Sequence, residues 1–171
     1  ARSVSVVTRE QMDARGVTSM PEAVRYAAGV GTGSAGFDPR FDQITIRGFP
    51  VNTTGDYLDG LRQTPGSYAY FRTEPYALER IDIVKGPMSV LYGQGTPGGV
   101  VNRISKRPGP DPIHEIVLLG ATHDRKQAAF DIGDSINESG SAKFRVVGLL
   151  RRGDTDLSLI HISEPTRRRG I

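Results

Sequence analysis

The sequence contains neither cysteine nor tryptophan, and it has no long apolar run. The absence of cysteine excludes disulfide bonds, thiol catalysis and zinc sites built on cysteine. No run approaches the ~18 apolar residues of a membrane-spanning helix. The sequence also lacks the charged start followed by an apolar stretch that is typical of a signal peptide. If the protein is exported, we expect its leader to lie upstream of Ala1.

Apolar residues are few, whereas residues that form turns are plentiful. Hydrophobic residues make up 37% of the 171 positions, and the chain has 21 glycines and 11 prolines. This length allows one domain, or one domain and part of a second. We therefore expect one modest core, short strands and many loops.

The net charge of +3 is concentrated at the C-terminal end. From Leu157 onward three arginines stand against one glutamate, which leaves a charge of only +1 for everything before Leu157. A basic face with interleaved aromatic residues is missing from that part of the sequence, so we expect no nucleic-acid partner.

Two capping patterns near the N-terminus predict two short helices. Thr8 with Gln11 opens the first helix, which Gly16 can end. Ser19 with Glu22 opens the second, and small apolar residues follow at helical spacing. Further along, alternation and turn residues predict short strands and single helical turns. The strands are Ile44–Ile46, a hairpin over Asp56–Arg62 that turns at Asp59 and Gly60, Ile81–Val84 and Val100–Lys106; the helical turns are Pro75–Glu79 and Met88–Tyr92.

A proline-rich linker separates this region from a different pattern. Pro108, Pro110 and Pro112 form the linker. Beyond it, three strand-like segments joined by short polar turns predict a meander: Glu115–Ala121, Ala128–Ile132 and Lys143–Leu149.

Several short motifs point to common chemistries, but their context argues against each. Gly93, Gly95 and Gly98 match G-x-G-x-x-G, yet a helical turn precedes them and β-branched residues follow, so a dinucleotide site is not expected. The tripeptide Arg152–Asp154 occurs commonly by chance. The three histidines lack metal-binding spacing: His114, His123 and His161.

The sequence has no nucleophile elbow either, so we expect the protein not to be an enzyme. Asp56 and Asp59 could act as an acid and base pair, but acidic residues beside a glycine turn are usually turn formers.

The segment Pro75–Pro108 carries a specific resemblance. It contains a Glu-Arg pair before a strand, a KGP turn, SVLYG, a loop rich in glycine and proline, VN and SKRP, in that order. Upstream, SVSVVTREQM, EAVRYAAGV, ITIRGF and YLDGLRQ occur at matching places. Over about Val4 to Arg151 the chain resembles the plug and the start of the barrel of TonB-dependent siderophore receptors.

The resemblance implies an α+β fold, in which a plug with a small mixed β-sheet and short helices precedes the first antiparallel strands of a truncated transmembrane β-barrel. The implied domains are a plug over 1–112, barrel strands over 113–153 and a non-native tail over 154–171. LSLIHISEPTRRRGI, from Leu157, resembles translated sequencing-adapter DNA; a divergent extracellular loop is the alternative. The TonB box is expected before Ala1.

The implied function is TonB-dependent uptake of ferric siderophores across the outer membrane of a Gram-negative bacterium, with the plug gating the barrel lumen from inside the barrel. The implied partners are the siderophore, TonB of the inner-membrane complex and the outer membrane. No cofactor is expected, and iron enters only within the siderophore. A receptor for haem or cobalamin remains an alternative, as does a soluble periplasmic α+β module whose strands after Pro112 extend the first sheet.

The resemblance also implies site residues. The ligand-binding candidates are Arg47, Gln63, Tyr68, Tyr70 and Phe71. Arg47 could hydrogen-bond hydroxamate or carboxylate oxygens, and the aromatic rings could contact a bulky chelate; the alternatives are a strand-end ion pair and local loop packing.

A second set is expected to shape the plug: Glu79, Arg80, Lys85, Gly86, Pro87, Tyr92, Gly93, Gly98, Gly99, Asn102 and Lys106. We expect the charged members of this set, together with Arg103, to form ion pairs within the plug or with the barrel wall.

Overall fold

The computed structural model describes residues 3–33, 42–52, 54–63, 72–86, 96–121, 125–137 and 139–152. The chain divides into two compact units, Ala1–Arg107 and Pro108–Ile171. Within the described ranges, none of the helices has the length and apolar character needed to cross a membrane.

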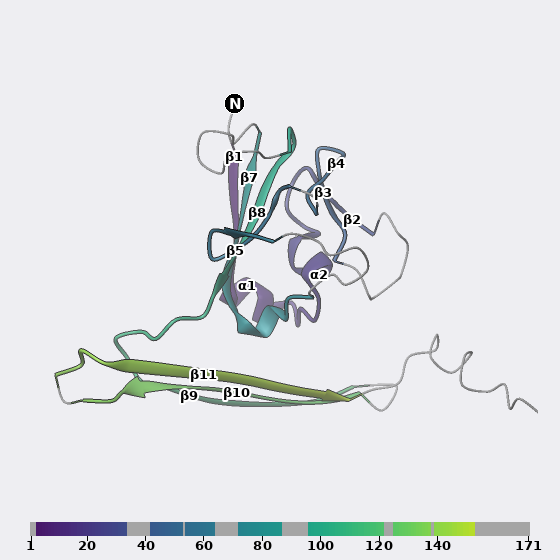
Figure 1. The fold of residues 1–171 in the computed structure, drawn as a ribbon. Coiled ribbons are helices and arrows are strands. Elements are labelled where there is room, and N and C mark those ends of the chain that lie inside the picture. Colours follow the sequence, from purple (N-terminus) through teal and green to yellow (C-terminus); the bar gives the residue numbers. More distant parts are fainter. Residues whose placement is uncertain are drawn as a thin grey trace, which may run out of the picture. The chain divides into compact units, whose positions relative to one another are not determined.

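The first unit is built on a mixed five-stranded sheet. Its strands lie in the order β1 (Ser3–Thr8), β7 (Leu78–Lys85), β8 (Gly99–Ser105), β5 (Asp56–Leu58) and β6 (Leu61–Arg62). β5 and β8 run parallel, whereas the other neighbours are antiparallel. Figure 1 shows β1, β7 and β8 side by side. The expected α+β fold with a small mixed sheet is confirmed.

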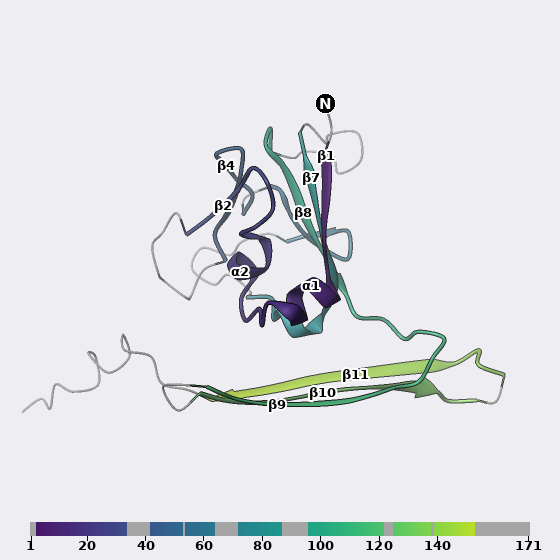
Figure 2. The same ribbon diagram turned by 180° about the vertical axis from the view of Figure 1, so that it is seen from behind.

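Two short helices follow β1, as Figures 1 and 2 show. Thr8 caps α1 (Arg9–Ala14) with the predicted capping box to Gln11. Ser19 caps α2 (Met20–Val24) by accepting from the Glu22 amide, but the Glu22 carboxylate accepts from the Thr18 amide and hydroxyl at 2.8 and 2.9 Å. The second box is therefore shifted by one residue, because Thr18 offers Glu22 two donors.

The core of this unit lies between the helices and one face of the sheet. Alternate residues of β7 point toward it, so Ile81 and Ile83 are completely buried. Burial of each such side chain stabilises the fold by roughly 1.5–3 kcal/mol. The rest of the cluster comes mainly from the helices and neighbouring strands: Val7, Met12, Met20, Ala23, Val24, Ile44, Ile46, Val51, Leu78 and Val101.

A second, smaller antiparallel sheet contains β2 (Val30–Thr32), β3 (Ile44–Ile46) and β4 (Phe49–Pro50). The strand predicted at Ile44 and the hairpin turning at Asp59 and Gly60 are both present. The helical turn η1 covers only Pro75–Ala77. The prediction of helix to Glu79 was wrong, because Leu78 already pairs with Ser105 in the main sheet.

Gly98 lies in close contact with the backbone of this small hairpin, and Gly99 with the backbone of β7. A Cβ at Gly98 would lie 2.2 Å from the Ile46 carbonyl oxygen, and one at Gly99 would lie 2.1 Å from that of Val84. Gly99 also has a φ of +137°, which L side chains rarely adopt. The neighbouring backbone therefore leaves no space for a side chain at either of these glycines, which were predicted to shape the plug.

We predict that Gly98→Ala lowers the free energy of unfolding by about 2–3 kcal/mol, since backbone must move to admit the methyl group. Urea denaturation of the chain measures the change. Gly109→Ala is the matched control, because a Cβ there meets nothing within 4 Å. Equal stability of the two variants would contradict the close packing.

The second unit is a three-stranded antiparallel meander of β9 (Ile113–Ala121), β10 (Arg125–Ser135) and β11 (Lys143–Arg152). The three predicted strands are confirmed and are longer than expected. They form a sheet of their own, so the alternative in which they extend the first sheet was wrong.

The cross-strand register gives this sheet two unlike faces, because directly opposed residues point to the same side. One face, which we call the apolar face, carries His114, Asp134, Lys126 and Arg152 at its two ends, and between them Ile116, Leu118, Ala128, Phe130, Ile132, Phe144, Val146, Gly148 and Leu150. The other face carries the buried Asp131, whose carboxylate accepts two hydrogen bonds of 2.8 Å from the Arg145 guanidinium. Arg151 lies on this face as well, and its Nε donates to Gln127 at 2.8 Å.

Candidate functional site

Arg47 lies at the tip of the β3–β4 hairpin. Its φ of 52° and the φ of 83° at Gly48 form the two-residue turn between the strands. The Arg47 amide donates to the Gly29 carbonyl at 2.9 Å, which fixes the turn, while the residue as a whole is exposed. A left-handed conformation is uncommon outside glycine, so the fold holds this arginine at the surface at some cost in strain.

Gln63 follows the end of β6 and is half-buried. Its amide donates to the Asp56 carbonyl at 2.8 Å, and its Nε2 donates to the Leu61 carbonyl at 3.3 Å. Within the described part of the chain, no hydrogen bond or ion pair joins Gln63 to Arg47. The other ligand-binding candidates lie outside the described residues: Tyr68, Tyr70 and Phe71.

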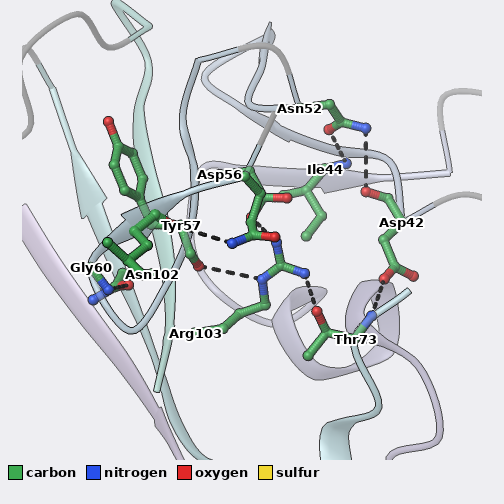
Figure 3. A network of polar contacts seen from close by, with 11 residues as sticks. Asp42, Ile44, Asn52, Asp56, Tyr57, Gly60, Thr73, Asn102 and Arg103 are labelled. Atoms are coloured by element: carbon green, nitrogen blue, oxygen red, sulfur yellow. Dashed lines mark hydrogen bonds and ion pairs between the residues drawn. The ribbon is translucent and has the colours of Figure 1, made fainter. Parts of the chain in front are cut away.

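A buried polar network centred on Arg103 (Figure 3) lies on the same face of the main sheet as the core, because Arg103 is directly opposite the core residue Ile81 in register. Only 3% of Arg103 is exposed. Its guanidinium donates to the Asp56 carboxylate and the Thr73 hydroxyl, and its Nε donates to the Tyr57 carbonyl at 3.4 Å. We call Arg103 with Asp56, Thr73, Asp42 and Asn52 the Arg103 network.

The network continues from Thr73 to Asp42 and Asn52. The Asp42 carboxylate accepts from the Thr73 amide at 3.4 Å. Asn52 donates to the Asp42 carbonyl at 3.4 Å and accepts from the Ile44 amide at 3.5 Å (Figure 3). Three stretches of irregular backbone, at 42, 52 and 73, are thus joined to the main sheet through one arginine.

Burial raises the pKa of Asp56, although the charge and hydrogen bond of Arg103 act to lower it. Burial also raises the pKa of Asp42, against the charge of Arg72 and the Thr73 amide. The pairing therefore offsets only part of the desolvation cost. Such a pair adds little net stability, but it is expensive to break, because the remaining charge stays buried alone.

Asp59 behaves as a turn former rather than as a catalytic group. It has a φ of 51°, it precedes Gly60, and its carboxylate accepts from the Ser105 amide at 2.9 Å. Desolvation alone would raise the pKa of Asp59, but the hydrogen bonds from Ser105 and the charge of Arg107 outweigh it and lower that pKa. Asn102 caps the same turn by accepting from the Gly60 amide at 3.0 Å.

The remaining charged candidates for shaping the plug differ in environment. Buried Lys85 donates to the Ser5 hydroxyl at 2.9 Å, and the Lys106 ammonium lies 4.0 Å from the Tyr76 ring centroid. Arg80 pairs with Asp82 at 3.1 Å on the surface.

Glu79 is exposed, and the buried Gly86 donates its amide to the Gly98 carbonyl at 2.9 Å. Pro87, Tyr92 and Gly93 lie outside the described residues. In the described ranges, no group of three or more His, Asp or Glu side chains could hold a metal ion.

Sequence reasoning missed Asp42, Asn52 and Thr73. No local spacing relates positions 42, 52, 56, 73 and 103, because tertiary folding alone brings them together. Only the parallel pairing of β5 with β8 could have indicated that Asp56 and Arg103 are neighbours.

Comparison with known families assigns this fold. The family model of the TonB-dependent receptor plug domain matches residues 1–100. The chain belongs to this family.

The chain is also similar to individual receptors. It is 45% identical over 160 residues to the ferrioxamine receptor of Yersinia enterocolitica, covering 91% of this chain and 22% of that protein. It is 39% identical over 152 residues to the ferrichrome outer membrane transporter/phage receptor of Escherichia coli K12, covering 88% of this chain and 20% of that protein.

Among solved structures, the pyoverdine outer membrane receptor of Pseudomonas aeruginosa PAO1, bound to pyoverdine, has the same fold. The TM-score is 0.81 at 24% identity, over 91% of this chain and 23% of that one. The chain thus spans about a fifth of the length of the relatives it matches. Family membership and the outer-membrane relative from Escherichia coli locate the protein in the outer membrane.

We predict that Arg103→Met destabilises the chain by about 3 kcal/mol at pH 7, because the Asp56 carboxylate is left without its counter-charge. Chemical denaturation measures the loss. Arg80→Met is the control: its pair with Asp82 is exposed, so the cost should stay below about 1 kcal/mol. A similar cost at both positions would rule out a special role for the Arg103 network.

This loss should depend on pH. The pKa of the Asp56 carboxyl is higher in the folded protein than its value near 3.8 in the unfolded chain. Such a group stabilises the fold at a pH below its pKa in the unfolded chain. This stabilisation is lost as the pH rises through its pKa in the folded protein. Removing Arg103 raises the folded pKa of Asp56 further, so the deficit of Arg103→Met should be smaller at pH 4 than at pH 7. Stability curves at the two pH values measure this, and the added change Asp56→Asn should abolish the difference.

Proposed function

We propose that the protein takes up ferric siderophores across the outer membrane by TonB-dependent transport. The match of the plug model over residues 1–100 carries this proposal, and relatives named for ferrioxamine and ferrichrome support the cargo class. The cargo is moved without chemical change, so no enzymatic activity is proposed. Iron is part of the cargo, and no resident cofactor is needed.

Arg47 is the residue that we propose to contact the siderophore. Its place at an exposed hairpin tip supports this role, since the guanidinium can donate two parallel hydrogen bonds to hydroxamate or carboxylate oxygens. Tyr68, Tyr70, Phe71 and Gln63 remain candidates for further contacts. TonB of the inner-membrane complex would then displace the plug to open the lumen.

We further propose that β9, β10 and β11 are the first strands of the barrel that encloses the plug. The apolar face supports this assignment, because seven of its side chains are 37% to 78% exposed, whereas the opposite face carries the buried Asp131–Arg145 pair. Along β11 the apolar face runs from Phe144 to Leu150, roughly 20 Å at ~3.4 Å per residue. At the ~35–45° tilt of barrel strands, this length spans ~14–16 Å of the ~25 Å apolar band of outer-membrane barrels.

We predict that Arg47→Asn in the full-length receptor weakens binding of ferric ferrioxamine by about 10- to 100-fold. This factor corresponds to the free energy of one hydrogen bond to a charged group. Asparagine tolerates the left-handed backbone, so the turn is preserved. Isothermal titration measures the affinity, and Arg25→Asn, at an exposed arginine directly after α2, serves as the control. Unchanged affinity would remove Arg47 from the binding site.

Transport itself is tested by iron uptake. Cells that depend on the full-length receptor should accumulate iron from ferrioxamine or ferrichrome only when TonB is present. Uptake of haem or cobalamin in place of either ferric siderophore would show that the cargo class is wrong.

A further inference from the structure

One end of the apolar face combines a groove with positive charge. Leu118, Ala128 and Leu150 lie directly opposite one another on the three strands. The small Ala128 side chain on the middle strand leaves a trough between the two leucines, which are 78% and 76% exposed. An open hollow of about 570 Å³ lies here, and these three residues form part of its lining.

The groove is bounded differently at its two ends. Toward the middle of the sheet the Phe130 ring lies across Gly148, where a Cβ would come within 2.3 Å of the ring. Toward the end of the sheet the next pair in register is Lys126 and Arg152, both exposed and both lining the hollow. Arg151 also borders the hollow, but its side chain belongs to the opposite face, where its Nε donates to Gln127.

The opposite end of the same face has a different charge. There the register places Asp134 opposite Phe144, and His114 opposite Ile132. Positive charge on this face is therefore confined to the end that carries the groove. An apolar trough that leads to paired cations is complementary to a molecule with an alkyl chain and an anionic head.

We propose that this end of the β9–β11 sheet binds an anionic membrane lipid. The phosphate of the lipid lies between Lys126 and Arg152, and one acyl chain lies in the groove over Ala128. The proposal rests on the part of the proposed function that places these strands in the outer membrane. The new element is that the cations at one end of these strands select anionic lipids from the surrounding membrane.

Native mass spectrometry of the full-length receptor in detergent tests the proposal. The probes are dioleoyl phosphatidic acid, dioleoyl phosphatidylcholine and inorganic phosphate. We expect phosphatidic acid to be retained preferentially, and Lys126→Gln with Arg152→Gln to reduce its retention roughly 30-fold, at ~1 kcal/mol for each cation. Lys143→Gln, at the other end of β11, should change nothing.

Ala128→Leu tests the groove separately, since it fills the trough while keeping the face apolar and the cations in place. It should also reduce retention of phosphatidic acid. Equal retention of both lipids, or no effect of the double glutamine variant, would overturn the proposal. Binding of inorganic phosphate as tight as that of phosphatidic acid would assign the cations to a free anion and would also overturn it.

Ferrioxamine binding measured on the same samples distinguishes a failure of the proposed lipid site from a failure of the proposed function. Retained siderophore binding with no lipid preference refutes only the lipid site. Lipid preference without binding of any ferric siderophore supports the lipid site and refutes the cargo class.

Discussion

The plug depends on one buried charge. Arg103 lies in the last strand of the first unit, is almost fully removed from solvent, and donates to Asp56, Thr73 and the Tyr57 carbonyl. A guanidinium in this position is tolerated only if its hydrogen bonds are satisfied, so the fold must bring distant backbone to it. The short β5 strand and the backbone at 42 and 73 are held there for that reason. An apolar side chain at this position could pack, but it would not specify where those segments lie.

This arrangement suits a domain with little apolar material. With 37% hydrophobic residues, the chain builds one compact cluster between two short helices and a sheet, and polar contacts position the remaining segments. Close backbone contact at Gly98 adds a second constraint, which ties the hairpin that carries Arg47 to the residues before β8. The proposed ligand contact is thereby connected to the main sheet through backbone, not through flexible side chains.

Local chemistry was predictable from the sequence, whereas long-range pairing was not. The Thr8 capping box and the turn at Asp59 and Gly60 involve residues within four positions, and both form as expected. Leu78 was assigned to a helical turn because its pairing with Ser105 is invisible locally. The Arg103 network was missed for the same reason. In β11, apolar residues on both faces, such as Val147 and Leu149, obscured an alternation that became clear only from the cross-strand register.

Native-state hydrogen exchange of individual amides in Arg103→Met tests the central role of this arginine most directly. The Thr73 amide donates to Asp42 and the Ile44 amide donates to Asn52, so both should lose protection together when Arg103 is removed. The Gly86 amide, which donates to the Gly98 carbonyl outside the Arg103 network, should lose less. Unchanged protection at Thr73 and Ile44, or an equal loss at all three amides, would contradict the view that Arg103 holds these segments in place.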